Sequence, residues 1–218
     1  MGARLWVLGG WRAAVGTQLF APGYWHPAVG TQLLAPSCWH PVVGTQRRAA
    51  TTDRISMQKI NKTNAARLLD KAGIEYRLIP YSYSEEDLSA QHVAAELGED
   101  IAAVFKTLVL RGDKTGLFVC VIPGNHEVDL KAAAKLSGNK SCALIHQKEL
   151  LPLTGYIRGG CSPIGMKKPL PTFIHLSALD QPRIFISAGV RGLQIEIAPQ
   201  DLISYTGATP AACATPAA

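Results

Sequence analysis

Residues 154–165 read Thr154-Gly155-Tyr156-Ile157-Arg158-Gly159-Gly160-Cys161-Ser162-Pro163-Ile164-Gly165, and the interpretation of the whole chain depends on this stretch. Its four glycines and one proline exclude a regular helix or strand, because glycine permits positive φ and proline fixes φ and lacks an N–H. Such a loop can offer backbone N–H groups to a carbonyl or phosphate oxygen. A surface turn is the simpler interpretation. A lysine within an apolar strand, Lys106, and a second glycine turn, Ser187-Ala188-Gly189, favour the binding loop.

Composition narrows the class of protein. The chain has 218 residues and a net charge of +6 at pH 7, which is enough for one domain with extensions. Only +2 of this charge falls in residues 57–218, so a broad duplex-binding surface is not indicated, whereas a small site for a nucleic-acid end stays open. Five cysteines without a CxxC pair favour a reducing, cytoplasmic location. No apolar run is long enough to span a membrane.

Residues 11–46 contain a repeat with a period of 14 residues, in which tryptophan and Gly-Thr-Gln recur in register. The repeats carry proline and glycine and show no helical stripe, so we expect a disordered, dispensable extension over residues 1–56, with Met57 as the natural start. A small aromatic binding tail is the functional alternative. The predicted organisation is therefore this extension, a folded domain over residues 57–207, and a disordered tail over residues 208–218 that lacks core-forming residues.

Beyond Met57 the pattern is that of a globular α+β domain. The first helix is predicted where Thr63 can cap an apolar stripe that Gly73 ends, and the next two are predicted to end at or near Gly98 and Gly138. A helical turn halted by Pro152 and a last turn opened by Pro199 complete the set. Strands are predicted where β-branched and aromatic residues gather. The predicted helices are 63–72, 89–97, 129–136, 147–151 and a turn from 199. The predicted strands are 75–80, 104–110, 117–122, 141–145, 172–176, 184–187 and 193–197. Strands outnumber helices, which indicates a largely antiparallel, curved or barrel-like sheet with helices packed outside.

Two strands carry informative faces. In 193–197, alternation places the three apolar residues on one face and Gln194 and Glu196 on the other. In 104–110, both faces are largely apolar, and Lys106 interrupts one of them. A lysine there either opens onto a cleft and meets an anion or polarised oxygen, or packs its stem on the sheet and extends its ammonium to water. The pattern alone does not separate these two interpretations.

Other candidate chemistry is weaker. Cys161 beside Ser162 suggests a nucleophile, but a nucleophile needs a nearby base, and the histidines of the domain show no spacing that marks one of them as that base. A small loop residue is the simpler interpretation of Cys161. His126-Glu127 lacks further ligands at metal-binding spacing, and no phosphate-loop or dinucleotide fingerprint follows a strand, so neither metal nor cofactor is expected. Lys167-Lys168 is either a phosphate contact or a solvated pair.

Three motifs in this order and spacing resemble the YbaK/EbsC family, the freestanding relatives of the editing domain of prolyl-tRNA synthetase. They are Phe105-Lys106-Thr107-Leu108, then Gly159-Gly160-Cys161-Ser162-Pro163-Ile164-Gly165, then Ser187-Ala188-Gly189 with Arg191-Gly192-Leu193. The resemblance covers roughly Met57 to Gly207. It implies a mixed sheet wrapped toward a barrel with helices around it, and a deacylase that acts on mischarged tRNA, notably cysteinyl-tRNA(Pro).

The resemblance also implies site residues. The family's pocket lysine corresponds to Lys106, and the first glycine of its loop corresponds to Gly159. The expected catalytic residues are Lys106, Gly159 and Gly160, and the expected substrate-binding residues are Tyr81, Thr107, Ser162, Pro163, Ser187, Gly189 and Gln194. The chain departs from the family at Leu88-Ser89, where some members carry an aromatic residue, and at Gln194, where the best-known branch has Asp. These departures concern the amino-acid preference rather than the reaction class.

The implied partners are the acceptor end of an aminoacyl-tRNA and prolyl-tRNA synthetase, without membrane, metal or cofactor. Loop N–H groups would stabilise the oxyanion, and Lys106 would position the ester. A cysteinyl thiol would attack its own carbonyl to give a thiolactone, and a positioned water would serve other amino acids. Two alternatives remain: a non-catalytic module of the same fold that binds a tRNA end or a synthetase, and a hydrolase that depends on Cys161.

Overall fold

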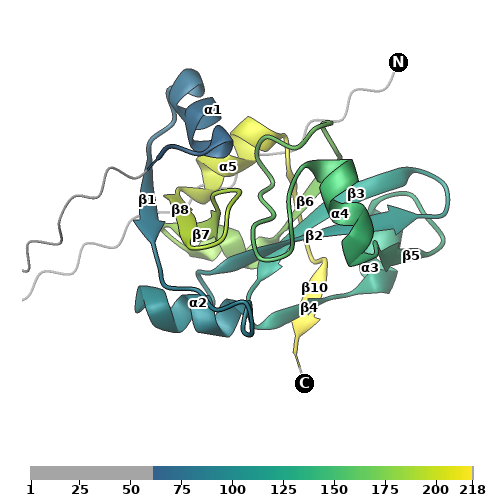
Figure 1. Cartoon of the computed structure of the whole chain (residues 1–218). Coiled ribbons are helices and arrows are strands. Elements are labelled where there is room, and N and C mark those ends of the chain that lie inside the picture. Colours follow the sequence, from purple (N-terminus) through teal and green to yellow (C-terminus); the bar gives the residue numbers. More distant parts are fainter. Residues whose placement is uncertain (1–60, 218) are drawn as a thin grey trace, which may run out of the picture. The chain divides into compact units, whose positions relative to one another are not determined.

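The structure is a computed structural model that describes residues 61–217. These residues form an α+β domain in which helices pack around three sheets (Figure 1). The predicted fold class is therefore confirmed. The repeat-containing extension 1–56, the expectation that it is dispensable, and the start at Met57 lie outside the described residues. In the part of the chain that the structure describes, no helix is both long and apolar enough to cross a membrane.

Three helices follow their capping signals. Helix α1 (Asn64–Ala72) begins after Thr63, whose side chain accepts from the Ala66 N–H, and ends at Gly73. Helix α2 (Ala90–Leu97) begins after Ser89 and ends at Gly98. Helix α3 (Leu130–Leu136) begins after Asp129, whose carboxylate accepts two N–H groups of the first turn. Because each of these side chains satisfies N–H groups that have no partner within the helix, the starts were readable from the sequence.

The larger sheet has the order β5-β2-β3-β6-β9. Strands β2 (Phe105–Gly112) and β3 (Gly116–Pro123) form the predicted antiparallel hairpin, and β5 (Cys142–Leu144) extends it beyond β2. Strand β6 (Thr172–His175) pairs in parallel with β3, which makes the sheet mixed. The short helix η1 (Leu176–Asp180) follows β6 directly.

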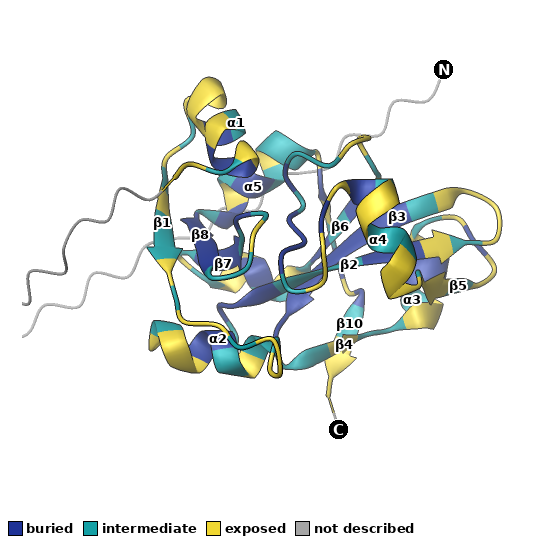
Figure 2. Cartoon of the chain, in the orientation of Figure 1, coloured by how far each residue is buried: buried dark blue, intermediate teal, exposed yellow. Residues whose placement is uncertain are grey.

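The three-stranded sheet has the order β1-β8-β7, and both of its strand pairs are antiparallel. Its strands are β1 (Tyr76–Pro80), β7 (Ile184–Ser187) and β8 (Leu193–Ile197). A parallel bridge between Val104 and Phe185 joins this sheet to the start of β2. The core lies between the two sheets and under α1 and the last helix, α5 (Pro199–Thr206), and its strands are buried at their centres (Figure 2).

Both faces of β8 are buried, although the sequence predicted one apolar and one polar face. Gln194 is 5% exposed and Glu196 is 6% exposed. Glu196 meets the opposing Arg77 of β1, whose Nε donates to Oε2 at 2.6 Å, so its charge is paired. A charge can be buried in this way only because its partner comes from the neighbouring strand, which alternation within one strand does not reveal.

Helix α4 (Gln147–Thr154) corrects the expectation that Pro152 halts the helix after residue 151. Proline removes one N–H from the helix, but it does not prevent a short final turn when other donors reach the last carbonyls. The Gly155 N–H donates to the Leu151 carbonyl at 2.9 Å and closes this turn, and the Lys167 Nζ also donates to the carbonyl oxygens of Leu151 at 3.3 Å and Pro152 at 3.2 Å. The helix ends at Gly155, which has a φ of 87°.

The segment after Gly207 also differs from the prediction of a disordered tail without a core. Strand β9 (Thr209–Ala211) pairs in parallel with β6, and β10 (Ala214–Pro216) pairs with β4 (His126–Val128). Cys213, between these two strands, is completely buried, and its carbonyl accepts from the Asp129 N–H at 3.0 Å. Backbone pairing and small buried residues hold this segment, so its lack of large apolar side chains was misleading.

Candidate active site

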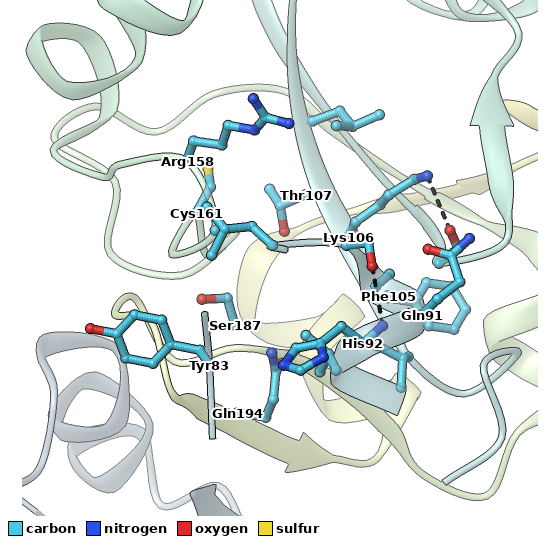
Figure 3. Close-up of a pocket in the computed structure, with 18 of the residues that line it drawn as sticks. Tyr83, Gln91, His92, Phe105, Lys106, Thr107, Arg158, Cys161, Ser187 and Gln194 are labelled. Carbon is cyan, nitrogen blue, oxygen red and sulfur yellow. Dashed lines mark hydrogen bonds between the residues drawn. The ribbon is translucent and has the colours of Figure 1, made fainter. Parts of the chain in front are cut away.

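A cavity of about 390 Å³ lies between the first half of β2, the connection from β1 into the start of α2, the glycine loop 155–165 and the adjoining ends of β7 and β8 (Figure 3). Six of the predicted site residues line it: Tyr81, Lys106, Thr107, Gly159, Ser187 and Gln194. Gly160, Ser162, Pro163 and Gly189 were also predicted and are not among the lining residues. Segments that are far apart in the sequence therefore converge on one site.

Lys106 contributes the cation of the cavity. Its Nζ donates to the carbonyl oxygen of Gly124 at 3.1 Å, and it forms no salt bridge with any residue in the described range (Figure 3). Burial lowers the pKa of the ammonium below its ordinary value, and the charge of Glu127 partly opposes this shift. One bond to a neutral carbonyl leaves two of the three ammonium donors for a ligand.

Two buried polar atoms at the cavity have no partner. The Oε1 atom of Gln194 and the Oγ1 atom of Thr107 make no hydrogen bond to any described residue. Leaving a buried polar group unsatisfied costs about 1–3 kcal/mol, and such groups are rare in folded proteins. Both residues line the cavity, but the two atoms themselves are shielded from it, so a ligand reaches them only after the side chains reorient.

Gly159 and Gly160 play different roles in the loop. Gly159 lines the cavity with a φ of +83°, and a Cβ there would lie 3.1 Å from Leu88 Cδ2. The Gly160 N–H donates to the carbonyl of Ile157 at 3.0 Å, which closes a turn. The prediction that Gly160 supplies a free N–H is therefore corrected, because the turn uses that donor. The Gly159 N–H makes no hydrogen bond to a described residue.

The predicted residues away from the cavity build the wall behind it. Ser162 is completely buried, and its Oγ accepts from the Ile164 N–H at 3.3 Å. The Tyr156 hydroxyl donates to the Ile164 carbonyl at 2.5 Å. Gly189 has a φ of +97°, and a Cβ there would lie 2.9 Å from Tyr156 Cε1. The positions of Ser162 and Gly189 thus indicate a structural role, because they shape the loop rather than reach the cavity.

Ser187 keeps a donor for the cavity. Its Oγ accepts from the Gly189 N–H at 3.2 Å, so its own proton stays free to donate. Ser187 lies near Gln194 in the close-up view, on the opposite strand of the β7–β8 pair (Figure 3). The cavity thus combines a hydroxyl donor, an amide oxygen that needs a donor, and a cation.

Cys161 lines the cavity, but its thiol is poorly suited to act as a nucleophile. Burial raises the pKa of the Cys161 thiol to about 12, so the reactive thiolate is scarce at neutral pH. His92 also lines the cavity, and its Nε2 lies 3.2 Å from the Ser82 carbonyl oxygen. That contact occupies one ring nitrogen of the residue that would have to serve as the base.

Several lining residues were not predicted from the sequence: Tyr83, Asp87, Leu88, Gln91, His92 and Arg158. Three of them, Tyr83, Asp87 and Leu88, come from the connection between β1 and α2, which has no periodicity and no motif, and Gln91 and His92 come from the first turn of α2. Arg158 directly precedes Gly159, and that adjacency was the signal that could have marked it. Among residues 61–217, no group of three His, Cys, Asp or Glu side chains could hold a metal ion.

Comparisons with known proteins give a consistent result. The family model described as an aminoacyl-tRNA editing domain matches residues 85–205. A protein of Enterococcus faecalis, EbsC, whose name proposes a Cys-tRNA(Pro)/Cys-tRNA(Cys) deacylase, is 51% identical over 145 residues, which is 66% of this chain and 88% of the relative.

Solved structures share the fold. The crystal structure of a proposed trans-editing enzyme for prolyl-tRNA synthetase is 25% identical, with a TM-score of 0.62, and the match covers 70% of this chain and 98% of that one. A hypothetical protein of known structure, 23% identical with a TM-score of 0.63, is matched over 68% of this chain and 97% of its own. The second likeness concerns the fold alone.

Proposed function

Because the chain belongs to the aminoacyl-tRNA editing domain family, we propose that it removes a mischarged amino acid from tRNA, with cysteinyl-tRNA(Pro) as the preferred substrate. The observation that carries the proposal is the cavity that places the half-buried Lys106, with two ammonium donors unused, beside the polar side chains of Thr107, Ser187 and Gln194. Such a set of side chains is suited to a polar ligand rather than an apolar one.

The aminoacyl ester supplies the matching groups. Its α-ammonium is a donor that fits the Gln194 amide oxygen once that side chain turns toward the cavity, and its ribose and phosphate oxygens are acceptors that fit Lys106 and Ser187. The carbonyl oxygen becomes an oxyanion as the ester is attacked, and the Gly159 N–H is the candidate donor for that charge. Lys106 holds the acceptor end so that the ester stays in one orientation.

The cysteinyl substrate needs no nucleophile from the protein. Its thiolate attacks the carbonyl carbon, a C–S bond forms, and the C–O bond to the ribose breaks. The thiol proton ends on the ribose oxygen, and the products are tRNA and cysteine thiolactone, which water later hydrolyses. A raised pKa for Cys161 is compatible with this route, because the route does not use that thiol. For other amino acids, a water molecule replaces the substrate thiol.

A second processing site is useful for small amino acids, because an aminoacylation pocket discriminates weakly between side chains that differ by a few atoms. A relative of known structure is described as a trans-editing enzyme for prolyl-tRNA synthetase. We extend this partner to the present chain: the synthetase releases mischarged tRNA(Pro), and this protein deacylates it. Co-purification of the two proteins with and without tRNA(Pro) tests whether they also associate.

The decisive experiment is a deacylation panel with the purified full chain and tRNA(Pro) charged with cysteine, alanine or proline. We expect fast release of cysteine and slow release of proline. A Thr107→Val variant is the matched control, because it keeps the shape and removes the unpartnered hydroxyl. It should deacylate more slowly, with an equal or higher melting temperature because an unsatisfied buried hydroxyl is removed. Equal ester decay with and without the parent protein would refute catalysis and favour a binding module of the same fold.

A further inference from the structure

The rim of the cavity consists of three segments that meet around one arginine. Tyr83, Asp87 and Leu88 come from the connection between β1 and α2, Arg158 and Gly159 come from the glycine loop, and Arg191 comes from the turn between β7 and β8. Arg191 is not among the residues that line the cavity. Its side chain is nevertheless only 19% exposed, because the other two segments enclose it.

Arg191 makes one hydrogen bond to each of the other two segments. Its Nε donates to the carbonyl oxygen of Arg158 at 3.0 Å. Its Nη1 donates to Oε1 of Glu85 at 2.7 Å. Glu85 is 79% exposed, so that ion pair contributes little to stability.

The backbones are also in close contact at this point. A Cβ on Gly160 would lie 3.3 Å from the backbone of Val190 and 3.4 Å from the backbone nitrogen of Arg191. A Cβ on Gly192 would lie 2.9 Å from Tyr83 Cδ1. The absence of side chains at Gly160 and Gly192 therefore lets the β7–β8 turn approach the other two segments closely, within reach of the Arg191 side chain.

The Arg158 carbonyl belongs to the same peptide group as the Gly159 N–H. A trans peptide is planar, and its C=O and N–H point in opposite directions. A donor that fixes the carbonyl therefore also fixes the direction of the N–H, and it polarises that N–H through the shared peptide group. Gly159 has a φ of +83°, a region in which glycine has wide backbone freedom, so this peptide needs an external hold.

We propose that Arg191 is a positioning residue whose bond to the Arg158 carbonyl orients the Gly159 N–H toward the reacting carbonyl of the substrate. Arginine suits this role because its planar fork makes two divergent bonds at once, to Arg158 and to Glu85, whereas a lysine ammonium has no fixed fork. The expected effect of Arg191 on the deacylation rate rests on the proposed function. Its expected effect on the orientation of the peptide group between Arg158 and Gly159 rests on the structure alone.

The test compares Arg191→Ala with Glu85→Gln in the full chain. Glu85→Gln removes the exposed charge pair and leaves the bond to the Arg158 carbonyl, so we expect a deacylation rate within about twofold of the parent. Arg191→Ala frees the peptide, and we expect kcat to fall about 10- to 100-fold with KM within about twofold, because a misplaced donor acts on the transition state. Equal losses in both variants would overturn the proposal.

A second readout does not depend on activity. The amide signal of Gly159 in a ¹⁵N–¹H spectrum should move in Arg191→Ala and stay in place in Glu85→Gln. An unmoved signal in Arg191→Ala refutes the positioning role even if turnover falls. Arg191→Lys serves if the alanine variant does not fold, and it should move the same signal. If the parent deacylates no tRNA, the proposed function fails, while the amide signal still decides the role of Arg191.

Discussion

Asn139 and Gln194 are both buried amides, with 8% and 5% exposure, yet their surroundings are opposite. The Oδ1 atom of Asn139 accepts from the N–H groups of Lys114 and Thr115, each at 2.9 Å. Its Nδ2 lies within bonding distance of the Thr115 hydroxyl at 2.7 Å and the Ser137 hydroxyl at 2.8 Å. The Oε1 atom of Gln194 has no partner among the described residues.

The difference separates a structural amide from one that awaits a ligand. Asn139 ties the turn between β2 and β3 to the end of α3, and all of its groups are used within the fold. A Cβ on Gly112 would lie 2.1 Å from Asn139 Nδ2, so the chain makes room for this amide at that position. Gln194 lines the cavity instead, and the unmet bond of its oxygen is a cost that a substrate relieves only when the amide turns toward the cavity.

The largest expected effect is at the cavity. Lys106→Ala should lower single-turnover deacylation by about 2–4 kcal/mol of transition-state free energy, comparable to the loss of one oxyanion donor. The melting temperature should change little, because Lys106 has one hydrogen bond and no salt bridge within the described range. The paired measurement is a thermal midpoint and a single-turnover rate. Unchanged turnover would show that Lys106 does not act in the reaction, and it would weaken the distinction between cavity residues such as Gln194 and structural residues such as Asn139.

The pH dependence tests the same ammonium. Burial lowers the pKa of Lys106, so the charge is present below that pKa and is lost as pH rises through it. Deacylation, after subtraction of spontaneous ester decay, should fall on the alkaline side, starting below the ordinary lysine pKa of about 10.4. Lys106→Arg should abolish this fall, because arginine stays charged. A parallel fall in both proteins would assign the alkaline limb to another group.

Asn139→Ala should lower the stability of the fold and leave the deacylation rate unchanged, which is the reverse of the effect expected for Lys106→Ala. Two backbone N–H groups lose their acceptor, so we expect a loss of about 2–3 kcal/mol in the free energy of unfolding. The deacylation rate below the melting transition should match the parent. Denaturant unfolding and a rate at low temperature are the measurements. A strong rate loss in a folded Asn139→Ala protein would show that the two amides are not separate in role.

Gln194→Leu sharpens the comparison, because leucine removes the unpartnered oxygen at a similar size. We expect the free energy of unfolding to stay equal or rise, and binding of cysteinyl-tRNA(Pro) to weaken by about 1–2 kcal/mol. Gln194→Glu is the matched control, since it keeps an acceptor and adds charge. A clear loss of stability in Gln194→Leu would mean that the amide serves the fold.

The smallest effect is expected at Cys161. Its thiol has a pKa raised to about 12, so Cys161→Ala should keep a deacylation rate within about threefold of the parent and lose about 1 kcal/mol of stability to the lost packing. Complete loss of activity in a folded variant would restore the cysteine hydrolase and overturn the substrate-thiol route.

Much of the fold was predictable, because its signals are local. Thr63 and Gly73 bound α1, and Ser89 and Gly98 bound α2, through bonds within one turn of each end. The hairpin of β2 and β3 follows from two β-rich runs and a short polar turn. The errors arose where the local structure depends on residues that are distant in the sequence. Lys167 donates to the last carbonyls of α4, Arg77 pairs with the charge of Glu196, and β9 pairs with β6.

The site was predicted in part for the same reason. Lys106 stood out as a charge in an apolar strand, and Gly159 stood out in a glycine-rich loop, so both were visible without the fold. The loss of the Gly160 donor to Ile157 and the close packing of Leu88 on Gly159 depend on three-dimensional contacts. The positions of His92 and Asp87 in the cavity wall also depend on the fold, because both residues lie in the part of the chain that passes along the cavity after β1.

The C-terminal strands have a consequence for biosynthesis. The buried Cys213 completes a core cluster with Leu110, Phe118 and Ile122 of the central hairpin, and β9 and β10 pair with strands made much earlier. A nascent chain on the ribosome therefore keeps that part of the core open until residues 209–216 have left the exit tunnel. Contacts between such distant residues form slowly. The half-made domain should therefore be the form that chaperones encounter, and a chain truncated before residue 209 should be degraded by proteases.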